Sequence, residues 1–102
     1  MSDFVKVALL SDIPEGHVKA VEVDAEDVAI CNVGGTLYAV SDICSHAHAH
    51  LSEGELEGKV ISCPLHGATF DVTSGKALCP PAVQPIAQYT VEVRDGEVWI
   101  KP

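Results

Sequence analysis

Hydrophobic and polar residues alternate along most of this chain in short runs, and many of the hydrophobic positions are β-branched. Such alternation is typical of half-buried β-strands. The pattern predicts strands at residues 4–10, 17–23, 27–33, 36–42, 59–63, 88–94 and 97–102. Helical periodicity is weak throughout, so we expect an all-β protein.

Two of the gaps between these runs contain residue pairs that favour tight turns. Gly34-Gly35 and Asp95-Gly96 each separate two predicted strands. Two-residue hairpin loops require positive φ angles, which glycine and aspartate tolerate well. We therefore expect two antiparallel hairpins.

The alternation weakens between about residues 42 and 84, where cysteine, histidine, glycine and proline accumulate instead. We interpret this segment as an insert of loops carried on the β scaffold. Loops that a rigid sheet positions often hold functional groups, so this insert is where chemistry is expected.

Length and composition fit one globular domain, residues 1–102. The sequence is 47% hydrophobic and 21% charged, which is enough apolar surface for a core. The formal net charge of −9 argues against binding nucleic acid, whose phosphates would be repelled. It favours a basic protein partner, although acidic composition also serves solubility alone.

The sequence has neither a signal peptide pattern nor an apolar run near the roughly 20 residues that a membrane span needs. We therefore expect a cytoplasmic protein without a membrane partner. In the reducing cytoplasm its four cysteines remain thiols and are available as metal ligands.

Two short clusters inside the insert each combine one thiol with one imidazole. Cys44-Ser45-His46 is followed, after sixteen residues, by Cys63-Pro64-Leu65-His66-Gly67. Structural zinc sites usually pair like ligands in each cluster, so the mixed pairs favour two adjacent irons. One iron would then take both cysteines and the other both histidines, as in Rieske [2Fe–2S] centres. A structural zinc module is the alternative.

These clusters, with the flanking sequences LSEGELEG (51–58) and CPLHGATFDVTSGKALCPPA (63–82), resemble the small Rieske ferredoxins of bacterial aromatic-ring-hydroxylating oxygenase systems. The similarity covers nearly the whole chain. It implies a Rieske fold, in which antiparallel sheets form a sandwich-like base below a loop-rich subdomain. It also implies one [2Fe–2S] cluster, with ligands Cys44, His46, Cys63 and His66.

The resemblance further implies a one-electron carrier that is not itself an enzyme. Such a carrier receives electrons from an NAD(P)H-dependent flavoprotein reductase and passes them to a terminal oxygenase; we expect a monomer. A Rieske small subunit of a larger reductase, such as an assimilatory nitrite reductase, is the alternative within the family. A terminal oxygenase subunit would need a further domain that 102 residues cannot supply.

Several other residues of the insert need an interpretation. His48 and His50 fall outside the family's ligand pattern, and we interpret both as solvated; the alternative is a pH-sensitive role in docking. Cys79 is not expected to be a ligand, and Cys31, within a strand run, is expected to be a small buried apolar residue. Asp42, Glu53, Glu55 and Glu57 could form an acidic rim that steers a basic partner.

The residues around the clusters also predict the redox potential. High-potential Rieske proteins carry a disulfide where this sequence has Ala49 and Leu65, and hydroxyl groups where it has Ala68 and Phe70. Hydroxyl hydrogen bonds stabilise the reduced cluster, so their absence lowers the potential. We predict a midpoint near about −150 mV, the low end of the Rieske range. Gly67 and the Pro80-Pro81 pair are expected to lie close to the cluster.

Overall fold

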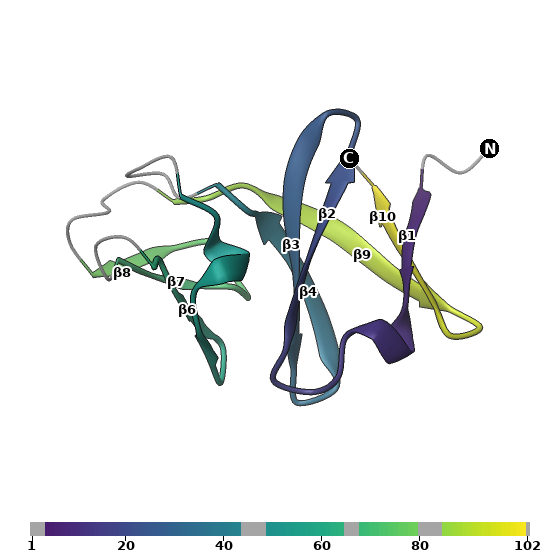
Figure 1. Ribbon diagram of the computed structural model, residues 1–102, viewed down its shortest axis with the longest axis horizontal. Coiled ribbons are helices and arrows are strands. Elements are labelled where there is room, and N and C mark those ends of the chain that lie inside the picture. Colours follow the sequence, from purple (N-terminus) through teal and green to yellow (C-terminus); the bar gives the residue numbers. More distant parts are fainter. Residues whose placement is uncertain (1–3, 44–48, 65–67, 80–84, 102) are drawn as a thin grey trace.

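The structure is a computed structural model, which describes residues 4–43, 49–64, 68–79 and 85–101. The described strands are β1 (Val5–Leu9), β2 (Val18–Val23), β3 (Glu26–Val33), β4 (Thr36–Ser41), β5 (Leu56–Glu57), β6 (Val60–Ser62), β7 (Thr69–Asp71), β8 (Ala77–Cys79), β9 (Gln88–Arg94) and β10 (Glu97–Lys101). Two single-turn 3-10 helices, η1 (Leu10–Asp12) and η2 (Leu51–Glu53), accompany them. The all-β prediction is confirmed (Figure 1).

Six of the strands form one antiparallel sheet in the order β1-β10-β9-β4-β3-β2. β1 and β2, at its two edges, also contact one another, so the sheet curls. Both predicted hairpins are present, with β3 joined to β4 through Gly34-Gly35 and β9 joined to β10 through Asp95-Gly96. All four turn residues have positive φ, as the sequence required.

The predicted insert contains more regular structure than its sequence indicated. The sequence predicted one strand there, whereas the described part of the insert forms a second antiparallel sheet in the order β5-β6-β7-β8. Figure 1 places this sheet at one end of the molecule, and β1 and β10 at the other. Strands of two or three residues are too short to show periodicity, so neighbouring strands must specify them.

Residues of β3 alternate between two apolar cores. Val28 and Ile30 face the interior of the curled sheet, together with Val98 and Ile100 of β10. Ala29 and Cys31 face the opposite way and pack with residues of the second sheet. β3 is therefore buried on both faces, and its outer face is the platform that supports the insert.

None of the described helices has the length and apolar character needed to cross a membrane.

Candidate metal centre

The second cysteine–histidine cluster lies on the hairpin formed by β6 and β7. The hairpin ladder continues past β6, because the amide of Cys63 donates to the carbonyl of Ala68 at 2.6 Å. Cys63 is thus held at the first position of the connection, opposite Ala68. Both residues are buried, with 2% and 0% of their surface exposed.

The first cluster lies on the connection between β4 and η2. Ile43 and His50 form an isolated antiparallel bridge across this connection, and the amide of Leu51 donates to the carbonyl of Asp42 at 2.6 Å. Ala49 and Leu51, which follow the cluster, pack in the same apolar core as Cys63. The described flanks of both clusters therefore meet in one core at the same end of the molecule.

Of the four predicted ligands only Cys63 belongs to the described residues. Cys44, His46 and His66 lie outside them, as do His48, Leu65, Gly67, Pro80 and Pro81. Among the side chains that are described, no group of three or more His, Cys, Asp or Glu residues could hold a metal ion. The ligand set therefore stays a prediction from the sequence.

The described surroundings of Cys63 fit an iron–sulfur cluster. The Cys63 thiol is free of any disulfide and is buried among Leu51, Ala68 and Phe70 in an apolar core. Soft thiolate sulfur is the ligand that such clusters use. Ala68 and Phe70 bring no hydroxyl group to this environment, in agreement with the basis of the low-potential prediction.

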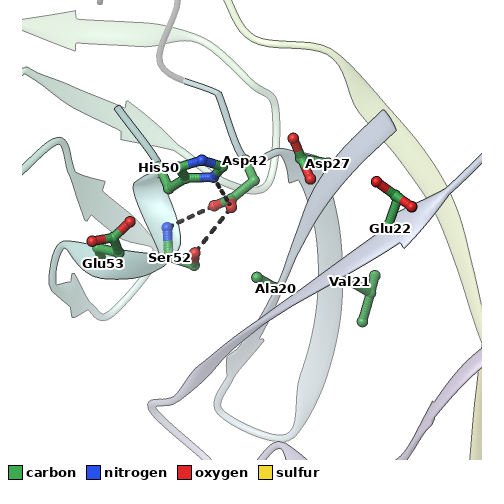
Figure 2. A pocket seen from close by; sticks show the side chains of 8 residues that line it. All are labelled: Ala20, Val21, Glu22, Asp27, Asp42, His50, Ser52 and Glu53. Carbon is green, nitrogen blue, oxygen red and sulfur yellow. Dashed lines mark hydrogen bonds and ion pairs between the residues drawn. The ribbon is translucent and has the colours of Figure 1, made fainter. Parts of the chain in front are cut away.

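A hydrogen-bonded network joins the residue Asp42, before the first cluster, to residues that follow it (Figure 2). The Asp42 carboxylate accepts from the Ser52 amide at 2.7 Å and the Ser52 hydroxyl at 3.0 Å, and it lies 2.9 Å from Nδ1 of His50. Only 1% of the Asp42 surface is exposed, so Asp42 cannot belong to an acidic rim, and that interpretation was wrong. His50 is 43% exposed, in agreement with the solvated interpretation, but it is also paired with Asp42, which the sequence did not indicate.

The network adjoins a hollow of about 370 Å³. Its lining residues are Ala20, Val21, Glu22, Asp27, Asp42, His50, Ser52 and Glu53. The hydrogen bond to Asp42 raises the pKa of His50 above its usual value, and the charges of Asp42, Asp27 and Glu53 act in the same direction. Sequence reasoning missed this network; the only available signal was Asp, His and Ser closely flanking a ligand cluster.

Cys31 agrees with the sequence interpretation, whereas the described side chains do not test that of Cys79. Cys31 is fully buried, and burial together with the charge of Asp42 raises the pKa of its thiol to about 12. It therefore stays protonated and behaves as a small apolar side chain. Cys79 ends β8, and its side chain lies outside the described part.

Comparison with known proteins identifies the class to which this chain belongs. Residues 3–90 match the Rieske [2Fe-2S] domain family, and the chain belongs to that family, whose cofactor is one Rieske-type cluster. A structural zinc module is thereby excluded.

The similarity to individual ferredoxins is close and extends over nearly the full length. The chain is 42% identical to the ferredoxin component of the naphthalene 1,2-dioxygenase/salicylate 5-hydroxylase systems of a Ralstonia species, over 97% of this chain and 95% of the relative. It is 46% identical to the 3-phenylpropionate/cinnamic acid dioxygenase ferredoxin subunit of Escherichia coli, over 89% and 86% of the two chains.

Solved structures give the same picture. The ferredoxin of carbazole 1,9a-dioxygenase from Nocardioides aromaticivorans superposes with a TM-score of 0.94, at 37% identity over 99% of both chains. A complex of reduced oxygenase and oxidised ferredoxin in carbazole 1,9a-dioxygenase contains a chain with a TM-score of 0.92 and 39% identity, over 99% and 94% of the chains. A candidate small subunit of an NADPH nitrite reductase is more distant, with a TM-score of 0.81 and 25% identity over 95% and 96%.

Proposed function

We propose that this chain is the ferredoxin component of a bacterial aromatic-ring-hydroxylating oxygenase system. It would accept single electrons from an NAD(P)H-dependent flavoprotein reductase and donate them to a terminal oxygenase. The observation that carries the proposal is its similarity, over nearly the whole chain, to ferredoxin components of such systems. The complex of a related ferredoxin with its oxygenase supports the oxygenase as partner.

Cys44, His46, Cys63 and His66 would hold the cluster, which supplies a site for one electron when bound. Two thiolates balance the charge of the oxidised cluster, while the neutral imidazoles add none, and this raises the potential above that of an all-cysteine cluster. The chain's contribution would be a dry environment around Cys63 and a rigid β platform below the two ligand segments. Both would limit reorganisation during electron transfer.

We further propose that the chain acts as one domain, as a monomer in the cytoplasm. Free thiols at Cys31 and Cys63 suit a reducing compartment. The lower identity to the candidate nitrite reductase subunit favours a mobile carrier over a fixed subunit. Gel filtration of a native extract separates these possibilities, since a fixed subunit would elute with a large complex.

The direct test is electron transfer by the purified protein. Oxidised protein should be reduced by NADH plus a flavoprotein reductase of a related system, and then reoxidised by the matching terminal oxygenase. Electron paramagnetic resonance should show the reduced Rieske signal in the wild-type protein and in Cys79→Ser, but not in Cys63→Ser or His66→Ala. Reduction without any transfer to an oxygenase would contradict the carrier role, and a colourless protein would contradict the cofactor.

A further inference from the structure

Asp42 is a buried carboxylate whose described side-chain partners all lie beyond residues 44–48, the segment that contains Cys44 and His46 and is called here the first ligand segment. Its carboxylate oxygens are bonded to the amide and hydroxyl of Ser52 and to the imidazole of His50. A buried carboxylate is costly unless it is hydrogen-bonded, and bonds to an ionised group are among the strongest in proteins. The strong bonds made by Asp42 therefore connect the chain before residues 44–48 with the chain after them.

Backbone hydrogen bonds also join the residues on either side of residues 44–48. The Asp42 carbonyl accepts from the amide of Leu51 at 2.6 Å, while the Asp42 amide donates to the carbonyl of Asp27 at 2.9 Å. The next pair of residues toward the first cluster, Ile43 and His50, forms an antiparallel bridge. Asp42 is thus fixed to the start of β3 on one side and to the segment beyond residues 44–48 on the other.

We propose that Asp42 and His50 are positioning residues, which clamp the two ends of the first ligand segment so that Cys44 and His46 are held ready to bind the cluster. This role rests on the proposed ligand set. The clamp constrains the spacing of the segment ends whether or not a cluster is bound. It therefore preorganises the ligands, which is how supporting residues around metal sites generally act.

His50 is the member of the clamp that can be changed with the least effect on the core. Its side chain is 43% exposed, whereas that of Asp42 is 1% exposed. Figure 2 shows its ring directed toward Asp42 at the edge of the hollow. Replacing His50 removes a donor at the surface, while replacing Asp42 changes a buried group to which Ser52 is also bonded.

The test uses the holoprotein and the variants His50→Ala, Asp42→Asn and His50→Arg. The first two should lose their cluster to an iron chelator at least tenfold faster than wild type, and their electron paramagnetic resonance lines should broaden. His50→Arg should return the rate to within about twofold of wild type, because a guanidinium can also donate to Asp42. Amide exchange at Leu51 and Ser52 should accelerate at least tenfold in His50→Ala.

Two controls separate positioning from general destabilisation. Val98→Ala weakens the core of the six-stranded sheet, away from the second sheet (Figure 1), and should lower the unfolding temperature without accelerating cluster loss. Glu53→Gln removes an exposed charge beside the hollow and should leave cluster loss within twofold of wild type. If Asp42→Asn fails to fold, His50→Ala still decides the matter.

Wild-type rates of cluster loss and amide exchange in His50→Ala would overturn the proposal. So would a rate of cluster loss in Val98→Ala equal to that of His50→Ala at matched stability. Failure of the ligand assignment would look different, because a variant of a proposed ligand, such as Cys63→Ser, would then keep the Rieske signal. The amide exchange measurement tests the clamp in either case, since it needs no cluster.

Discussion

Gly54 lies directly against the backbone carbonyl of Ser62, the residue before Cys63. A Cβ atom at position 54 would overlap that carbonyl oxygen and come within 3.3 Å of the Leu51 carbonyl. The contact joins the end of η2 to β6, and therefore the flank of one ligand segment to the flank of the other. Glycine is required here by close backbone approach rather than by an unusual φ angle.

Gly54→Ala should therefore destabilise the protein by about 1–3 kcal/mol, the usual cost of overpacking, and should disturb the cluster spectrum. The measurement is urea unfolding together with the visible spectrum. Gly96→Ala is the matched control: position 96 has positive φ and open space around it. It should cost about 1 kcal/mol with an unchanged spectrum. Wild-type stability of Gly54→Ala would contradict the contact.

The turn between β2 and β3 places two non-glycine residues in the left-handed region. Asp24 has φ 50° and Ala25 has φ 66°, and the left-handed conformation costs an L-residue such as alanine roughly 1 kcal/mol or more. Ala25→Gly should relieve this strain and raise the free energy of unfolding by about 0.5–1 kcal/mol.

The same substitution in a strand provides the control for Ala25→Gly. Ala20, in β2, is exposed and extended, so Ala20→Gly should lower stability by about 0.5–1 kcal/mol. Chemical denaturation of both variants measures the two effects. A loss of stability in Ala25→Gly would show that the turn is not strained.

The pairing of His50 with Asp42 should make stability depend on pH. The hydrogen bond to Asp42 raises the pKa of His50 in the folded protein, so the folded state binds the proton more tightly than the unfolded state. The resulting stabilisation is complete below the ordinary histidine pKa of about 6.5 and is lost as pH rises through the higher folded value.

Urea midpoints measured from pH 5 to 9 should therefore fall with rising pH for the wild type. His50→Gln can donate to Asp42 but cannot titrate, so its midpoints should fall less over the same range. The acidic neighbours Glu22, Asp27 and Glu53 remain in both proteins. An identical slope in the variant would exclude His50 as the source.

A hydroxyl group introduced opposite Cys63 should raise the redox potential. Ala68 is buried, and its carbonyl is bonded to the Cys63 amide. We expect the wild type near about −150 mV and Ala68→Ser about 40 mV higher, because one net hydrogen bond of about 1 kcal/mol corresponds to that shift for one electron. Ala20→Ser, on the six-stranded sheet, should leave the midpoint unchanged in a spectroscopic titration. A wild-type midpoint above zero would contradict the low-potential prediction.

Three exposed glutamates, Glu53, Glu55 and Glu57, remain from the predicted acidic rim. If they steer a basic oxygenase, the association rate should decrease steeply with salt. Their joint replacement by glutamine should lower that rate about tenfold at low ionic strength, as measured by stopped-flow reoxidation. Replacing three acids on turns of the other sheet, Glu15→Gln, Asp24→Asn and Asp95→Asn, should have little effect. Equal losses in both triple variants would indicate net charge alone.

The sequence by itself determined the β-strands of the six-stranded sheet and two of its turns, because alternation and turn chemistry are local properties. It also determined the family, because the cysteine–histidine spacing and its flanking sequence identify the ligand segments without any coordinates. Cys31 was understood correctly for a similar reason, since a cysteine within a hydrophobic strand run is most simply buried.

Tertiary structure alone decided features that depend on distant neighbours. The short strands β5, β7 and β8 have too few residues for a periodic signal, and pairing with β6 and with each other specifies them. The Ala25 turn lacks the glycine that would have indicated it. Asp42 looked like a surface acid, and His50 like a solvated histidine, because charged and polar residues are usually exposed. The tertiary structure brings the two side chains together, so that Nδ1 of His50 lies 2.9 Å from the buried Asp42 carboxylate.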